Sequence, residues 1–153
     1  MHKIGILSDT HGMLRPEVLE KLDGCDLILH GGDINRKEIL NRLEEIAPVY
    51  AVRGNNDKEW ADYLPETISL EVEGCRIFMV HNKKQVPKEL SEIDVVVFGH
   101  SHKYSEQSID NRVWLNPGSC GKRRFDQETT FALMEVDGKN ILIEKVDIAH
   151  KQK

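Results

Sequence analysis

Seven side chains with metal-binding chemistry follow apolar runs of this sequence, each near the point where a run stops. They are Asp9, His11, Asp33, Asn55, His81, His100 and His102. A short apolar run closed by Gly and polar residues is typical of a buried strand that ends in a loop. Open α/β sheets bind ligands at the carboxyl ends of their strands. We therefore expect these side chains to gather at one end of the strands.

Carboxylates, imidazoles and an amide oxygen suit borderline divalent ions better than a thiolate site would. Seven ligands exceed the set of about four that usually closes around one ion, but they suit two ions that share one carboxylate. Two ions about 3.5–4 Å apart can clamp the attacking and leaving oxygens of a displacement at phosphorus. They also lower the pKa of a water between them, so that hydroxide forms near neutral pH. The pattern therefore indicates phosphoryl chemistry.

Turn formation is the alternative for any one of these loops, because Asp and Asn before Gly are common in turns. Turn formation does not account for all five loops together, which are those that carry Asp9 and His11, Asp33, Asn55, His81, and His100 and His102. His30 also ends an apolar run, but Asp33 lies three residues further on, past two glycines. The two side chains need not point to the same place, so packing or support of a ligand explains His30 better than direct metal binding.

The elements that must position these residues alternate in the first half of the chain. Apolar runs predict strands at 4–7, 26–30 and 48–52, and helical spacing predicts helices at 16–22 and 36–46. This order predicts a parallel half-sheet with right-handed crossovers. The second half favours hairpins, with strands at 67–73, 76–81, 94–98, 105–109, 112–115, 130–136 and 141–148 and a short helix at 87–93.

The fold class that follows is α/β (α+β), with one mixed sheet or two sheets packed face to face and helices outside; the strand order stays open. Length and composition fit one globular domain over residues 1–153, with 39% hydrophobic and 31% charged residues. Three unclustered cysteines argue against a disulfide framework. No run has the length of a membrane span and no signal peptide is visible, so we expect a cytoplasmic protein. The net charge of −5 disfavours strong nucleic-acid binding.

The ordered motifs resemble the calcineurin-like metallophosphoesterase superfamily. They are Asp9-Thr10-His11, Gly32-Asp33, Gly54-Asn55, Asp57, His81 and Gly99-His100-Ser101-His102. The short length and Asn116-Pro117-Gly118-Ser119 resemble the YfcE-like phosphodiesterase subfamily. The resemblance implies a four-layer α/β/β/α sandwich. It assigns a first metal to Asp9, His11, Asp33 and His102, and a second to Asp33 as the bridge, Asn55, His81 and His100. It makes Asp57 an orienting group for its loop.

Two positions depart from the family pattern. Many members carry His after the ligand Asn, where it contacts the phosphate or protonates the leaving group, whereas this chain has Asn56. An amide can donate a hydrogen bond to the substrate but cannot deliver a proton at neutral pH. Asn82 stands where the family has Gly, and Asn tolerates left-handed backbone angles better than most residues, so we expect a small local adjustment. Arg124 aligns with a family Arg; phosphate binding and a solvated surface charge are equal alternatives for it.

The function implied is hydrolysis of small phosphodiesters by a hydroxide that bridges two divalent metals. Mn²⁺ is the expected metal, and Fe, Zn, Ni, Co and Mg fit the same ligands. The alternatives are a catalytically weak, protein-binding scaffold of the same fold, a phosphomonoesterase and a nuclease. Nothing in the sequence determines the natural substrate or the oligomeric state.

Overall fold

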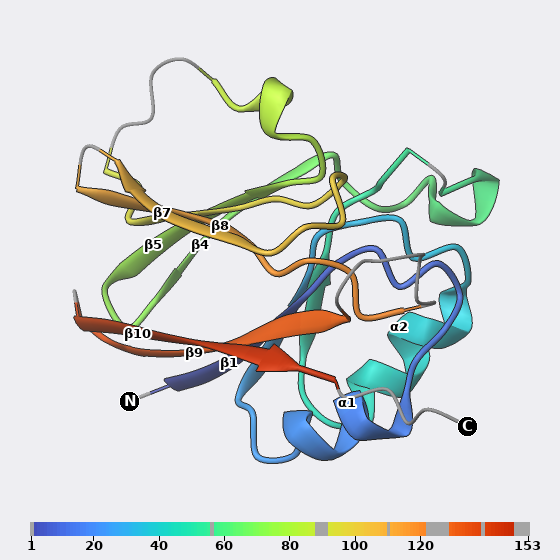
Figure 1. Cartoon of the computed structure of the whole chain (residues 1–153). Coiled ribbons are helices and arrows are strands. Elements are labelled where there is room, and N and C mark those ends of the chain that lie inside the picture. Colours follow the sequence, from blue (N-terminus) through green and yellow to red (C-terminus); the bar gives the residue numbers. More distant parts are fainter. Residues whose placement is uncertain are drawn as a thin grey trace.

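The computed structural model describes residues 2–55, 57–87, 92–109, 111–121, 129–138 and 140–148. Two five-stranded mixed sheets pack face to face in this part of the chain (Figure 1). The first has the order β10-β9-β1-β2-β3 and the second the order β4-β5-β6-β8-β7. The expected fold class is confirmed.

The first sheet has a parallel half built by crossover helices. Strand β1 pairs with β2, and β2 with β3, in parallel register. On its other side β1 pairs antiparallel with β9, which pairs with β10. The elements are β1 (His2–Leu7), α1 (Pro16–Leu22), β2 (Leu27–His30), α2 (Lys37–Glu44), β3 (Val49–Ala51), β9 (Thr130–Asp137) and β10 (Asn140–Asp147).

The second sheet combines two hairpin edges with a parallel centre. Strand β5 pairs antiparallel with β4 and parallel with β6, while β8 pairs parallel with β6 and antiparallel with β7. The elements are β4 (Thr67–Val72), β5 (Cys75–Val80), β6 (Val95–Val97), β7 (Ser105–Ile109) and β8 (Arg112–Asn116).

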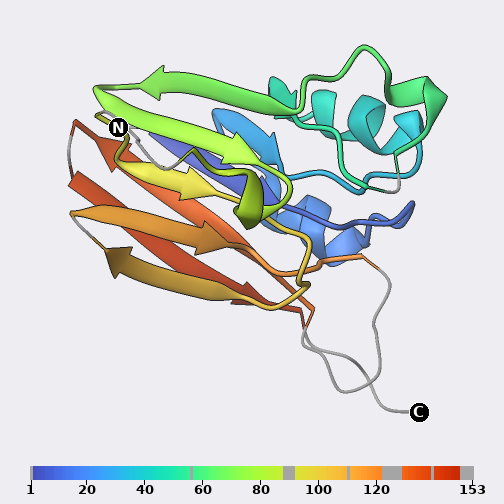
Figure 2. The ribbon, with the colours of Figure 1, turned by 90° about the horizontal axis from the view of Figure 1, so that it is seen from above.

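Apolar side chains form a core in each space between the layers. Ile6 and Leu29 point between the two sheets, where they meet Met79 of the second sheet. Leu7 and Ile28 point to the other face, which α1 and α2 cover (Figure 2). Because β1 and β2 are buried on both faces, their sequences are continuously apolar rather than alternating. The outer face of the second sheet packs against the segment around η2 (Lys83–Gln85).

Element positions agree closely with the expected ones where the periodicity is strong. The helix at Pro16–Leu22 has the predicted bounds, and the second helix is Lys37–Glu44 rather than 36–46. Two short 3₁₀ turns, η1 (Glu59–Ala61) and η2, were not expected, because three residues are too few for a periodic pattern. The short helix expected at 87–93 lies mostly outside the described residues.

No helix in the described ranges is both long enough and apolar enough to cross a membrane. The predictions of one domain and of a cytoplasmic location stay predictions.

Leu29→Ala tests how strongly the space between the sheets stabilises the protein. Leu29 is 0% exposed, so we expect a loss of about 2–5 kcal/mol in the free energy of unfolding. The same change at Leu142 on β10, which is 70% exposed, should alter it by less than about 0.5 kcal/mol. Urea unfolding measures both variants, and equal losses would contradict this description of the core.

Candidate metal centre

The loops that follow β1, β2, β3, β5 and β6 meet at the carboxyl ends of these strands. The Asp9 amide donates to the Gly32 carbonyl at 2.9 Å, which joins the first two loops. The Gly99 amide donates to the His81 carbonyl at 2.9 Å, which joins the last two. The Asp9 carboxylate then links the two sheets, because its Oδ2 accepts from the His100 amide at 3.1 Å.

Left-handed backbone angles occur at five of the expected ligands. The angle φ is 53° at Asp9, 47° at His11, 56° at Asp33, 76° at His100 and 65° at His102. A non-glycine residue in this conformation costs roughly 1–2 kcal/mol. Such strain persists where surrounding contacts impose it, and it clusters at functional sites. The surrounding contacts therefore hold these loops in strained backbone conformations that direct the five side chains toward one place.

Four of the expected ligands form one cluster. Asp9, His11, Asp33 and His102 each offer a donor atom, and these atoms all lie within 4.8 Å of one another. The two imidazole Nε2 atoms are 3.2 Å apart, and that of His102 is 3.3 Å from Asp9 Oδ1. Asp9 and Asp33 are buried, and His11 is partly exposed. This spacing lets the four donors contact one ion.

His81 borders this cluster from the second sheet. Its Nδ1 donates to the Gly31 carbonyl at 2.7 Å, so a neutral ring presents a lone pair at Nε2. That Nε2 lies 3.2 Å from Asp33 Oδ2 and 3.9 Å from Asp9 Oδ1. Burial lowers the pKa of His81, but the carboxylates of Asp33 and Asp9 raise it further, so the net pKa lies above its ordinary value.

Two buried atoms here have no hydrogen-bond partner among the described residues: Asp9 Oδ1 and His81 Nε2. A buried polar atom without a partner costs about 1–3 kcal/mol, and more when charged. Ser8 Oγ and the His100 amide already occupy Asp9 Oδ2, so Oδ1 is the oxygen left to face the imidazoles. A cation between these atoms would satisfy both.

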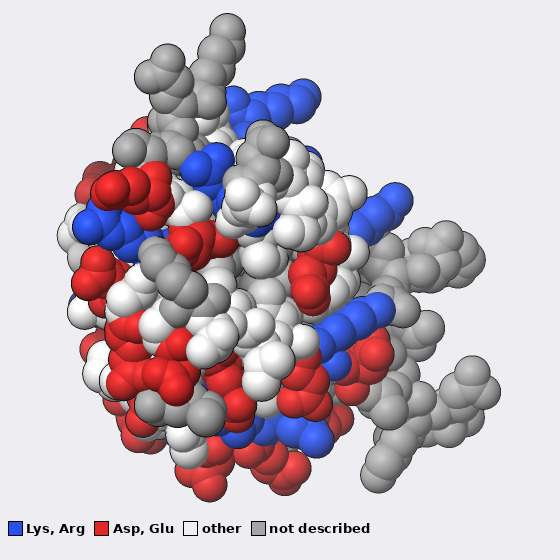
Figure 3. Space-filling view, turned by 90° about the vertical axis from the view of Figure 1, so that its left-hand side faces the viewer, with Lys and Arg blue, Asp and Glu red and all other residues white. Residues whose placement is uncertain are grey.

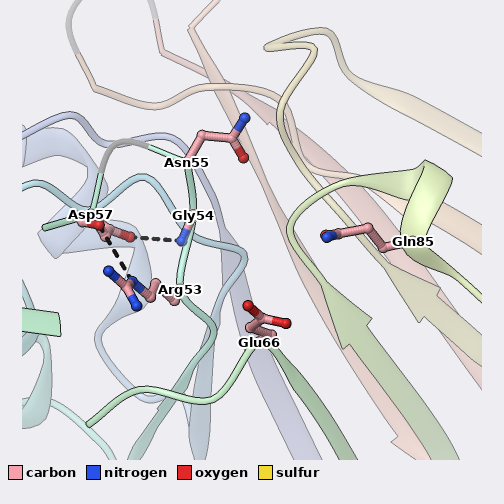
Figure 4. Close-up of a pocket in the computed structure, with 6 residues that line it drawn as sticks. All are labelled: Arg53, Gly54, Asn55, Asp57, Glu66 and Gln85. Atoms are coloured by element: carbon pink, nitrogen blue, oxygen red, sulfur yellow. Dashed lines mark hydrogen bonds between the residues drawn. The ribbon is translucent and has the colours of Figure 1, made fainter. Parts of the chain in front are cut away.

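The remaining two expected ligands lie at the rim. The ring of His100 is exposed and meets the ring of His81 edge-on, with centroids 5.4 Å apart. Asn55 is also exposed and lines a pocket beside the cluster (Figure 4). The ring of His100 lies beside the cluster without joining its four-donor set, and Asn55 lies in the wall of the neighbouring pocket.

Asp57 holds the loops that carry Asp33 and Asn55. Its carboxylate accepts four backbone N–H groups at 2.8–3.0 Å, from Asp33, Ile34, Asn35 and Gly54. Gly54 packs so closely that a Cβ there would lie 2.1 Å from the Asp33 amide nitrogen. The buried carboxylate thus fixes the Asp33 backbone and occupies its own oxygens in doing so.

The segment from Asn116 to Ser119 joins the first and last ligand loops. The Asn116 amide donates to the Gly99 carbonyl at 3.2 Å and to Ser101 Oγ at 3.0 Å. Ser119 Oγ donates to the Asp9 carbonyl at 2.8 Å. The sequence indicated this motif only as a feature of the family and did not predict these positioning contacts. The one local indication of them was an Asn-Pro-Gly-Ser turn directly after an apolar strand.

His30 lies outside the cluster and is held by two hydrogen bonds. Its Nδ1 accepts from the Gly32 amide at 3.1 Å, so Nε2 carries the proton and donates to Thr10 Oγ1 at 3.0 Å. Burial lowers the pKa of His30 from 6.5 to about 4. It is a neutral group that supports the ligand loops, in agreement with the packing interpretation.

Three expectations have other outcomes. Asn56 and Arg124, the expected substrate-binding residues, lie outside the described residues. At Asn82 the adjustment does not use a left-handed angle, because φ is −109° and the backbone is extended. Its side chain accepts from the Lys84 amide at 3.0 Å and caps η2, so no glycine is needed there.

Asp57→Asn tests the anchoring of the ligand loops. The new amide nitrogen would face backbone N–H donors in a buried place, so we expect a loss of about 3 kcal/mol in the free energy of unfolding. Asp62→Asn is the matched control, since Asp62 is exposed and pairs with Arg53 at 3.3 Å; it should cost less than about 1 kcal/mol. Chemical denaturation measures both, and similar losses would overturn the anchoring role.

His30→Gln tests the buried neutral imidazole through its pH dependence. Between pH 6.5 and about 4 the unfolded chain protonates His30 and the folded chain does not. The stability of the metal-free parent protein should therefore fall as the pH is lowered through this window, with His30 contributing about 3 kcal/mol. The variant should lack this part of the fall. Urea unfolding from pH 7 to 4 measures the difference, and parallel curves would contradict it.

Comparisons with known proteins agree with the site. Residues 2–139 match the model of the calcineurin-like phosphoesterase superfamily domain. The chain is 31% identical over 152 residues to a probable metallophosphoesterase of Methanothermobacter thermautotrophicus, covering 90% of this chain and 88% of that protein. It is 29% identical over 140 residues to a phosphodiesterase of Methanocaldococcus jannaschii, covering 77% and 84%.

Solved structures share the fold. The phosphoesterase YfcE from E. coli superposes with a TM-score of 0.71 at 24% identity, covering 96% of this chain and all of that one. Vps29 from Entamoeba histolytica, solved with Zn²⁺, superposes with a TM-score of 0.74 at 22% identity, covering 95% and 98%. The match to the family model spans most of the sequence and confirms the resemblance read from the motifs. The chain belongs to the calcineurin-like phosphoesterase superfamily.

Proposed function

We propose that this protein is a dinuclear metal-dependent phosphodiesterase that hydrolyses small phosphodiesters. The observation that carries the proposal is the convergence of buried donor atoms without partners. Asp9 Oδ1 and His81 Nε2 both face the space that Asp33, His11 and His102 enclose. Neither atom makes a hydrogen bond within the described part of the chain. Their nearest polar neighbours, Asp33 Oδ2 at 3.2 Å from His81 Nε2 and His102 Nε2 at 3.3 Å from Asp9 Oδ1, belong to the same donor set.

The donor set fits divalent ions in chemistry as well as in spacing. Asp9, His11, Asp33 and His102 would hold the first ion. Asp33, Asn55, His81 and His100 would hold the second, supported by the 3.2 Å approach of His81 Nε2 to Asp33 Oδ2. Ions held there supply a Lewis acid for the phosphoryl oxygens and acidify a water near neutral pH.

The chain's own groups prepare this chemistry. Nδ1 of His81 is committed to a backbone carbonyl, so its Nε2 lone pair faces the site whenever the ring is neutral. His30 stays neutral beside it and adds no positive charge. Asp57 and Asn116 hold the ligand loops, so little reorganisation is needed when an ion binds.

The finer parts of this proposal concern the metal and the substrate contacts. Mn²⁺ is our proposed metal, and the mixed carboxylate and imidazole set also accepts Fe, Zn, Ni, Co and Mg. The Vps29 of similar fold was solved with Zn²⁺. Diester preference is supported by the name of the relative from Methanocaldococcus jannaschii. Substrate binding by Asn56 and Arg124 stays a prediction.

A protein-binding scaffold is the second candidate, because Vps29 structures share the fold. The strained ligand loops favour the enzyme, since a scaffold has no need to keep left-handed angles at five potential ligands. A polymeric nucleic acid fits less well. Acidic groups cover much of the end of the molecule where β1 begins (Figure 3), and Glu71 and Glu73 lie there near Asp26. This end lies far from the candidate metal centre, so it adds to the net charge of −5 that repels a long polyanion and does not face a phosphate at the centre.

Asp33→Asn tests the shared carboxylate. The amide keeps the shape and tolerates the left-handed angle at position 33, but it is a weaker metal ligand. We expect kcat/KM for a small phosphodiester to fall at least about hundredfold with Mn²⁺. The stabilisation of the protein by added Mn²⁺ should shrink as well. Steady-state kinetics and thermal unfolding with and without metal measure the two effects.

His2→Ala is the control, because His2 lies at the far end of β1 and pairs with Glu73 at 3.1 Å. Equal activity of the two variants would overturn the dinuclear assignment. Elemental analysis of the purified protein adds an independent measurement, with about two metal equivalents expected from this assignment. One equivalent or none after loading would contradict it.

A further inference from the structure

A polar pocket of about 220 Å³ adjoins the candidate metal centre. It lies between the loop after β3, the start of β4 and the end of η2 (Figure 4). Its walls are Arg53, Gly54, Asn55, Asp57, Glu66 and Gln85. The volume has room for roughly seven water molecules, which suits a group of the size of glycerol or a pentose.

The pocket shares a wall with the metal centre. Gly54 packs against the Asp33 carboxylate so closely that a Cβ there would lie 2.3 Å from Oδ1. Asp57 accepts the Asp33 amide at 3.0 Å from the same side. Asn55, a proposed metal ligand, also lines the pocket. A group attached to a phosphate at the centre can therefore extend into this space.

Two of the three charged side chains that line the pocket, Arg53 and Asp57, already make hydrogen bonds or ion pairs within the protein. The Arg53 guanidinium pairs with Asp62 at 3.3 Å and donates to the Asp57 carbonyl at 3.4 Å. The Asp57 carboxylate accepts its four backbone amides. The Arg53 guanidinium keeps further N–H donors, but in Figure 4 it is turned toward Asp57, whereas the Glu66 carboxylate and the Gln85 amide point toward the open space of the pocket.

These two groups select by chemistry. A carboxylate repels a second phosphate or another acid, and it accepts hydrogen bonds from hydroxyl groups. A primary amide donates and accepts, so it matches a hydroxyl in either direction. None of the described residues that line this pocket is aromatic; Trp60 lines the neighbouring pocket on the other side of Arg53, Asn55 and Asp57. The favoured occupant is therefore an uncharged group that carries several hydroxyls.

We propose that this pocket binds one of the two alcohol portions of the phosphodiester, and that this alcohol is a polyol. Its hydroxyls donate to Glu66 and exchange hydrogen bonds with Gln85. The inference rests on the proposed phosphodiesterase function and adds the substrate class to it. The pocket binds and orients this portion; the bonds made and broken stay those of ordinary ester hydrolysis by water.

Two substrates with one leaving group test the proposal: 4-nitrophenyl glyceryl phosphate and 4-nitrophenyl propyl phosphate, which differ only in the two hydroxyls. The parent protein loaded with Mn²⁺ should show a higher kcat/KM for the glyceryl ester. Glu66→Gln should lower the ratio of the two kcat/KM values about tenfold, because it weakens a charged acceptor. Gln85→Ala should lower the ratio severalfold. The matched control is Glu144→Gln on exposed β10, which should leave the ratio unchanged.

The outcomes separate the two proposals. Equal kcat/KM for both esters in the parent protein, or ratios that Glu66→Gln and Gln85→Ala leave unchanged, would overturn the polyol pocket while the phosphodiesterase stands. No hydrolysis of either ester with Mn²⁺, Fe²⁺, Zn²⁺, Ni²⁺, Co²⁺ or Mg²⁺ would overturn the proposed function, and the polyol pocket with it.

Discussion

Two carboxylates held in one buried space constrain everything around them. Asp9 and Asp33 both lie near the imidazoles of His11 and His81. Both carboxylates are buried, so water screens their charges little. Like charges at this range repel unless cations lie between them. Nearby groups support the carboxylates in two ways. Burial keeps His30 unprotonated, so it adds no charge. Ser8 Oγ and the His100 amide donate hydrogen bonds to Asp9 Oδ2. The fold thus holds two buried carboxylates close together in a place where a bound cation would stabilise both.

The supports come from parts of the chain that are distant in sequence, which explains the sandwich. Asp33 depends on Asp57 in the loop after β3, while Asp9 depends on Ser119 and on the His100 loop of the second sheet. Only strands that end at a common level can bring such loops together. The strand ends therefore hold the four-donor cluster, while Glu66 and Gln85 line the pocket beside it.

The sequence predicts this frame well and the contacts within it poorly. The helix at Pro16–Leu22 and the first strands follow from apolar periodicity, and the ligand types follow from residues at the strand ends. Strand order does not, because β1 pairs with β9 from far along the chain, and no local pattern encodes a partner. Nor do the Asp57 and Asn116 hydrogen bonds, which depend on backbone groups that every residue carries. Glu66 gave no signal either, since one exposed carboxylate resembles any other.

The position of β9 has a consequence for how the protein is made. Strand β1 lies between β2 and β9, although β9 spans Thr130–Asp137 and is synthesised long after it. During translation this largely buried strand must wait with one edge unpaired until nearly the whole chain has emerged. An unpaired apolar edge is a site for aggregation. His102, needed for the four-donor cluster, also comes late. The four-donor cluster is therefore complete only after the chain has been made beyond His102.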